Sequence, residues 1–137
     1  MLFRSPDTLT DIYPHKGPLS GIHSALRVSK NDLICVPVDM PLLDENMLME
    51  LVNIGLKTAM IAHYQNQVLP VFIPNTFNSN QYLERVLSSN TNTSLKHFLS
   101  HIGCVQIKTK NPRHLINVNT PEQWEQAVKS INNNYQF

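Results

Sequence analysis

The feature that most constrains the fold of this chain is an apolar run, Leu33 to Val38, that is followed at once by a carboxylate, Asp39. A nearly continuous apolar run of this kind is typical of a strand that is covered on both faces of its sheet. Open α/β sheets bind ligands at the edge formed by the carboxyl ends of such strands. Because unpaired carboxylates are rarely buried, Asp39 is the first candidate for a functional residue, and a divalent metal and a phosphate would suit it.

Helical and extended segments alternate along the rest of the chain. Periodicity and capping signals predict helices over 19–28, 80–87 and 94–101. Another helix is expected from Asp44, with an inward face made of Met47, Leu48, Leu51, Val52 and Leu56. The last helix is expected from Pro121, with Trp124, Ala127 and Val128 facing inward. Strands are expected over 33–38, 58–64, 68–73 and 104–107, and a further extended segment ends at 116–118. Residues 65–67 are expected to join the middle two strands as a hairpin. The alternation predicts one α/β domain over 1–137 with a doubly wound sheet, a loop over 1–16 and a frayed tail over 133–137.

Composition narrows the classes of partner. The chain has 137 residues, a formal net charge of +1 and 15% charged residues, which gives no basic surface for nucleic acid or an anionic membrane. It contains no run of about 20 apolar residues, the length that a transmembrane helix needs. Cys35 and Cys104 lie far apart in predicted strands and have no zinc-site spacing, so we interpret them as buried thiols. We therefore expect a cytoplasmic protein that binds neither nucleic acid nor membranes.

Four short blocks, in this order and with these gaps, carry a family resemblance. They are Asp11 ahead of the Gly-Pro-Leu-Ser-Gly stretch at 17–21, then 36–41, 69–72 and 116–122. Together they resemble the molybdenum cofactor guanylyltransferases, a branch of the Rossmann-like nucleotidyltransferases. The likeness spans residues 11–132. The family's opening strand and glycine-rich Leu-Ala-Gly-Gly loop have no counterpart in this sequence, so the resemblance implies a C-terminal portion of that fold.

The resemblance implies a reaction, its partners and a set of site residues. GMP would pass from GTP to the terminal phosphate of molybdopterin-bound molybdenum, with Mg²⁺ as cofactor and pyrophosphate as product. Molybdoenzymes or other proteins of cofactor biosynthesis would be the protein partners. By this resemblance, Asp39 is the catalytic metal ligand, and the nucleotide also contacts Asp11, Gly17 and Pro18, while the acceptor contacts Asn117, Asn119 and Thr120.

Each of these residues also has a structural interpretation. Asp39 can cap the turn through Met40 and Pro41, and Asp11 can be a solvated acid. The 17–21 stretch can be an ordinary helix start, although a helix start also presents free backbone N–H groups and the positive end of the helix dipole to an anion. Asn117 and Thr120 can form an Asx turn and cap the last helix.

The histidines give no separate chemistry. His97 and His101 have the i, i+4 spacing of a zinc pair, but no Glu follows His97 as in the H-E-x-x-H motif. His63 is predicted on a strand and His23 in a helix, and neither has an obvious Ser or Cys partner in the sequence. We interpret all four as packing or surface residues.

Two consequences follow from the absent opening strand and glycine-rich loop. Two alternative functions also stay open. GTP binding by this chain alone should be weak, since several charge-assisted hydrogen bonds would be lost. One flank of the strand at 33–38 should carry unpaired backbone groups. The alternatives to a guanylyltransferase are a nucleotidyltransferase that uses CTP or a sugar phosphate, and a non-catalytic binding module.

Overall fold

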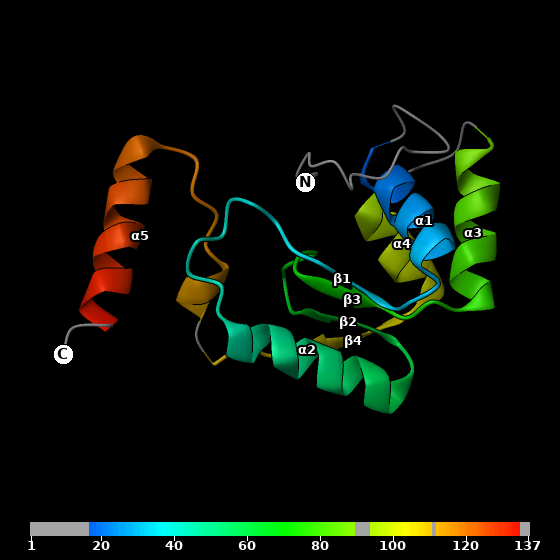
Figure 1. The fold of residues 1–137 in the computed structure, drawn as a ribbon, viewed down its shortest axis with the longest axis horizontal. Coiled ribbons are helices and arrows are strands. Elements are labelled where there is room, and N and C mark those ends of the chain that lie inside the picture. Colours follow the sequence, from blue (N-terminus) through cyan, green and yellow to red (C-terminus); the bar gives the residue numbers. More distant parts are fainter. Residues whose placement is uncertain (1–16, 90–93, 111, 135–137) are drawn as a thin grey trace.

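A four-stranded sheet with helices on both faces forms the body of the protein (Figure 1). The computed structural model describes residues 17–89, 94–110 and 112–134. In chain order the elements are α1 (Pro18–Ser29), β1 (Leu33–Cys35), α2 (Glu45–Thr58), β2 (Ile61–Tyr64), β3 (Val71–Ile73), α3 (Phe77–Leu87), α4 (Leu95–Ile102), β4 (Cys104–Ile107), a 3₁₀ helix (Pro112–Leu115) and α5 (Pro121–Asn134). The expected loop at 1–16 lies outside the described residues, and α5 continues two residues into the segment expected to fray.

The sheet is mixed, with strand order β1-β3-β2-β4. β3 runs antiparallel to both β1 and β2, and β2 runs parallel to β4. The expected hairpin is confirmed, because β2 and β3 pair in the register Ala62↔Phe72 and His63↔Val71. β2 and β4 pair with Ile61 opposite Cys104. The α/β class is confirmed, and the single reversed strand comes from that hairpin.

The apolar run of the sequence forms an edge strand. β1 pairs with β3 alone, so its outer flank has no strand partner within the described residues, as expected. The expectation that 33–38 forms a strand covered on both faces is wrong: β1 ends at Cys35, and Ile34 and Val38 are 38% and 73% exposed. The physical reason is the edge position, which supplies a neighbour on one side only.

Two apolar layers lie on the two faces of the sheet, because successive strand side chains point to opposite faces. Ile61, Val71 and Ile73 pack with buried residues of α1, α3 and α4, including Leu19, Ile22, Leu26, Leu83, Leu87, Phe98 and Leu99. Ala62, Tyr64 and Phe72 pack on the other face against α2. Figure 1 shows this arrangement, with α2 alone below the sheet. The result is a three-layer sandwich.

The inward face of α2 differs in part from the sequence expectation. Asp44 caps the helix as expected, since its Oδ1 accepts a hydrogen bond of 2.9 Å from the Met47 N–H. Met47 and Leu51 are buried, but Leu56 is 59% exposed. Gly55 holds the next buried position, because it continues the i, i+4 stripe of Met47 and Leu51. A Cβ on Gly55 would overlap the Phe72 ring, so glycine allows helix and sheet to approach closely.

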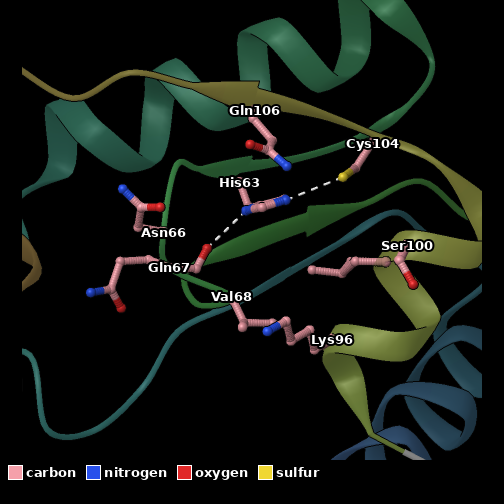
Figure 2. Close-up of a pocket in the computed structure, with 9 residues that line it drawn as sticks. His63, Asn66, Gln67, Val68, Lys96, Ser100, Cys104 and Gln106 are labelled. Atoms are coloured by element: carbon pink, nitrogen blue, oxygen red, sulfur yellow. Dashed lines mark hydrogen bonds between the residues drawn. The ribbon is translucent and has the colours of Figure 1, made fainter.

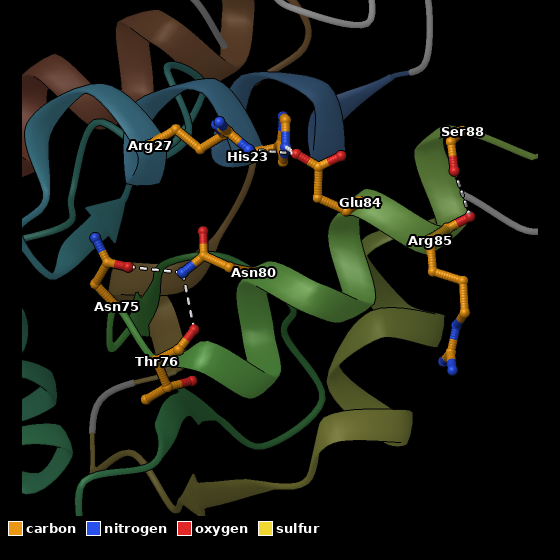
Figure 3. Close-up of polar contacts among 8 residues, drawn as sticks. All are labelled: His23, Arg27, Asn75, Thr76, Asn80, Glu84, Arg85 and Ser88. Carbon is orange, nitrogen blue, oxygen red and sulfur yellow. Dashed lines mark hydrogen bonds and ion pairs between the residues drawn. The ribbon is translucent and has the colours of Figure 1, made fainter.

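Polar contacts join α1 to α3 inside the larger layer (Figure 3). The His23 side chain is fully buried, and its Nε2 lies 2.8 Å from Glu84 Oε1. Arg27 Nη1 donates to the same oxygen over 2.6 Å. A carboxylate shared by a buried imidazole and a guanidinium holds the two helices in register. His23 therefore has a packing role, as expected.

The C-terminal part of the chain lies away from the sheet (Figure 1). Residues 116–118 follow the 3₁₀ helix and form no strand. Ala127 is buried in α5, but Trp124 and Val128 are 43% and 48% exposed, so the expectation that they face inward is wrong. The reason is that α5 does not rest on a face of the sheet. None of the helices that the structure describes is long and apolar enough to cross a membrane.

Candidate functional site

Asp39 lies in the turn that follows β1, at the carboxyl end of that strand. Its side chain is half-buried, and within the described residues its carboxylate makes no hydrogen bond or ion pair. The turn-cap interpretation thus has no hydrogen bond to support it in this part of the chain. Asp39 is held instead through its backbone, whose carbonyl oxygen accepts a bond of 2.7 Å from the Val118 N–H. The turn is fixed while the carboxylate oxygens are left for a ligand.

The same backbone bond brings the 116–120 segment beside Asp39. Two of the blocks that carried the resemblance, 79 residues apart at Asp39 and Val118 by their numbering, are therefore neighbours in space. Asn117 and Asn119 flank Val118, and both are exposed. They are the polar residues on either side of the backbone bond to Asp39.

Thr120 acts in the structure as a helix cap. Its Oγ1 accepts a bond of 3.2 Å from the Gln123 N–H. Gln123 Oε1 in return accepts from the N–H groups of Asn119 and Thr120, over 2.7 and 3.2 Å. This reciprocal arrangement is a capping box. The structural interpretation of Thr120 is therefore observed, and the box fixes the backbone of Asn119 next to Asp39.

Gly17 and Pro18 open α1, both exposed. Gly17 has φ 74° and ψ −159°, a conformation that requires glycine, and no side chain caps this helix start. The structure describes no contact between this helix start and Asp39. Asp11, the other expected nucleotide contact, lies outside the described residues. Of the predicted site residues, then, the structure joins Asp39 to the 117–120 group.

A hollow of about 250 Å³ opens next to this group. It lies between the loop that follows β1, the 112–118 segment and the start of α5, and its lining includes Leu42, Arg113, Val118, Gln123 and Ala127. Arg113 is a site residue that our sequence reasoning missed. The sequence feature that could have pointed to it is the group of basic residues Lys108, Lys110 and Arg113 between β4 and α5. A guanidinium in this hollow suits a phosphate or another anion.

Asp39 suits a magnesium ion that is bound mainly by phosphate oxygens and water. The described residues contain no group of three or more His, Cys, Asp or Glu side chains arranged for a metal ion. Mg²⁺ usually takes one or two carboxylates, together with phosphate oxygens and water, instead of a complete protein cage. A single half-buried carboxylate that has no partner among the described residues meets that requirement.

Comparison with known proteins identifies the family. The sequence profile of the MobA-like NTP transferase domain matches residues 4–108, which is more than half of the chain. The chain belongs to this family. It is 31% identical over 129 residues to a probable molybdenum cofactor guanylyltransferase of Clostridium perfringens strain 13, over 87% of this chain and 65% of that protein. It is 26% identical over 125 residues to a molybdenum cofactor guanylyltransferase of Xanthomonas euvesicatoria, over 88% and 65%.

A solved structure of this MobA-like family shares the fold. It is molybdopterin-guanine dinucleotide biosynthesis protein A from Archaeoglobus fulgidus, with a TM-score of 0.67 and 21% identity over 85% of this chain and 64% of the other. The Rossmann-like nucleotidyltransferase fold expected from the sequence is thereby confirmed. The chain spans about 65% of the length of the curated relatives it matches.

A second polar cluster was missed by the sequence reasoning. His63 was expected to have no Ser or Cys partner, but the structure places Cys104 Sγ 3.1 Å from His63 Nε2 (Figure 2). The two residues are 41 positions apart and meet only because β2 pairs with β4. No local spacing in the sequence announces that pairing.

Proposed function

We propose that this chain takes part in the transfer of GMP from GTP to molybdopterin-bound molybdenum cofactor, a Mg²⁺-dependent reaction that releases pyrophosphate. The product would be the molybdopterin-guanine dinucleotide form of the cofactor. Membership of the MobA-like family supports the nucleotidyltransferase class, and the likeness to the Clostridium and Xanthomonas guanylyltransferases supports the guanylyl group and the acceptor.

One observation carries the proposal for this chain. The hydrogen bond from the Val118 N–H to the Asp39 carbonyl oxygen joins the turn that carries this carboxylate to the segment that carries Asn117 and Asn119. Val118 and Arg113 both line the neighbouring hollow. A carboxylate, two amides and a guanidinium are thus carried by segments that meet at Val118. Phosphoryl chemistry needs this combination of groups.

Each candidate site residue has a separate role in the proposed reaction. Asp39 holds the Mg²⁺ ion through its carboxylate, and the bound ion supplies charge neutralisation at the α-phosphate and the departing pyrophosphate. Gly17 and Pro18, at the positive end of the α1 dipole, contact the nucleotide phosphates, and Asp11 also contacts the nucleotide. Asn117 and Asn119 bind the acceptor phosphate. Arg113 adds a positive charge on the acceptor side.

The test is the loss of turnover in Asp39→Asn. We expect transfer to fall by at least about a hundredfold, because the amide keeps the shape of the side chain but removes the negative charge that fixes the metal. Guanylated cofactor is measured at saturating GTP and Mg²⁺, so that weak GTP binding does not mask the effect. Glu45→Gln, an exposed carboxylate at the start of α2, is the matched control and should retain activity. Normal turnover of Asp39→Asn would reject the assignment.

A non-catalytic binding module is the second candidate, and the outer flank of β1, which has no strand partner among the described residues, favours it. A module would bind molybdopterin without turning over any nucleotide. Supplying CTP in place of GTP tests the remaining alternative in the same assay. Guanylation with GTP and none with CTP is the result that we expect.

A further inference from the structure

A second hollow lies away from Asp39, on the face of the sheet that α4 covers. It has a volume of about 450 Å³ and opens between β2, the loop that follows it, β4 and α4. His63, Val68, Lys96, Ser100, Cys104 and Gln106 are among its lining residues (Figure 2). None of the residues proposed above for GMP transfer lines it, so it is a separate site.

The hydrogen bonds of His63 fix the tautomer of its ring. Its Nδ1 lies 2.9 Å from the Tyr64 carbonyl oxygen and 2.8 Å from that of Gln67. Carbonyl oxygens only accept, so Nδ1 carries the hydrogen, and in the neutral ring Nε2 keeps its lone pair. Cys104 Sγ, 3.1 Å from Nε2, is therefore the donor in that hydrogen bond. The imidazole is oriented to accept the proton of this thiol.

The sheet keeps this pair together. In the parallel register of β2 and β4, His63 lies opposite Gln106, and Cys104 is two residues before Gln106 on the same face. His63 as a residue is 7% exposed, which limits competition from water for Nε2. Figure 2 shows both side chains turned toward one another, with the Lys96 side chain entering from α4.

The charge around the pair has one sign. The titratable side chains among the described lining residues are those of His63, Cys104 and Lys96, and no carboxylate is among them. Lys96 is exposed and forms no ion pair with the described residues. The hollow therefore favours an anionic ligand over a cationic ligand.

We propose that Cys104 is a thiol-modification site for small anionic disulfides of the glutathione type, with His63 as the base. The thiol proton passes to His63 Nε2 as Sγ attacks one sulfur of the disulfide. A new bond forms between Sγ and that sulfur, the original S–S bond breaks, and the departing thiolate takes the proton from His63. The disulfide is the oxidant, and one small thiol is released for each mixed disulfide formed.

The second cysteine of the chain provides an internal comparison. Burial raises the pKa of Cys35 from 9.0 to about 11, and no histidine contacts its sulfur in the described structure. Burial also raises the pKa of Cys104, so this thiol keeps its proton at neutral pH until His63 removes it. The two cysteines are both partly buried. They differ in that Cys104 has a histidine, His63, within hydrogen-bond distance of its sulfur.

The experiment measures the rate of mixed-disulfide formation by intact-mass spectrometry. The folded chain is incubated with glutathione disulfide at a series of pH values around neutrality. Cys35→Ser leaves Cys104 as the reactive thiol, Cys104→Ser leaves Cys35, and His63→Gln in the Cys35→Ser background removes the base. Cystamine, a cationic disulfide of similar reactivity, is the matched reagent. Circular dichroism checks that each variant is folded.

We expect one glutathionyl group, at Cys104. The Cys104→Ser variant and the His63→Gln variant should each react at least about tenfold more slowly. Without His63 the rate should rise by about tenfold per pH unit toward the thiol pKa, and with His63 present this rise should be shallower, because the base removes the thiol proton. Glutathione disulfide should react faster than cystamine, and Lys96→Gln should reduce that preference.

Modification of Cys35 at an equal or higher rate would overturn the proposal. So would a His63→Gln variant whose rate and pH profile match those of its parent. The comparison of the two cysteines and of the two disulfides needs only the wild-type chain. The proposal therefore stays testable if the His63 variant does not fold.

Discussion

Gly55→Ala tests how closely α2 packs against the sheet. An added Cβ would overlap the Cδ1 and Cε1 atoms of Phe72 and lie 2.7 Å from Cγ, closer than carbon atoms approach without displacement. Phe72 is 3% exposed on the central strand β3, so its ring has little space into which it can move. Overpacking of this kind costs about 1–3 kcal/mol. Replacing glycine by alanine inside a helix returns about 1 kcal/mol, so we expect a net loss of about 1 kcal/mol in the free energy of unfolding.

Urea unfolding followed by circular dichroism measures this loss as a lower midpoint with an unchanged slope. Asn53→Ala, at an exposed position of the same helix, is the control, and it should stabilise slightly through helix propensity alone. Phe72→Leu makes room for the new methyl group. Combined with Gly55→Ala it should show a coupling of about 1 kcal/mol in a double-mutant cycle. A Gly55→Ala variant that is more stable than wild type, or strict additivity in the cycle, would refute the packing argument.

Three further predictions concern single contacts. Burial raises the pKa of Cys35 from 9.0 to about 11, so the thiol of the unfolded chain ionises first as the pH rises. The free energy of unfolding of wild type should therefore fall by about 2–3 kcal/mol between these two pH values. Urea titrations should show that Cys35→Ala lacks this part of the fall. Glu84→Gln weakens the contacts to buried His23 and to Arg27, and should lower the free energy of unfolding by about 1–2 kcal/mol, whereas exposed Glu125→Gln should not. Thr120→Ala removes the hydroxyl that caps α5 and should weaken that helix by about 1 kcal/mol, seen as faster hydrogen exchange over its first turns.

The sequence predicted the local elements well, because caps and periodicity act over a few residues. Asp44 caps α2 as expected, and the expected hairpin joins β2 to β3, although its loop spans 65–70 and not 65–67. The errors are at positions decided by distant neighbours. Leu56 has helical spacing but the sheet meets Gly55 instead, and Trp124 has an apolar side chain but α5 has no sheet face to cover.

The candidate site shows the same division. Asp39 was found from its place after an apolar run, and the structure leaves its carboxylate without a protein partner in the described residues, while the nearness of Val118 rests on one long-range backbone bond. Thr120 could not be separated from a helix cap by sequence, because threonine suits both roles. The His63–Cys104 pair was invisible, since only the pairing of β2 with β4 brings the two side chains together.

Paramagnetic broadening by Mn²⁺ tests the central claim most directly, because it locates a weakly held metal. Isotope-labelled chain is titrated with Mn²⁺ and GTP, and amide signals are compared between wild type and Asp39→Asn. The account predicts the strongest broadening at the amides of residues 38–40 and 118–119, dependent on GTP and lost in the variant. Broadening centred elsewhere, or the same pattern in Asp39→Asn, would contradict the claim that this carboxylate holds the metal against the nucleotide.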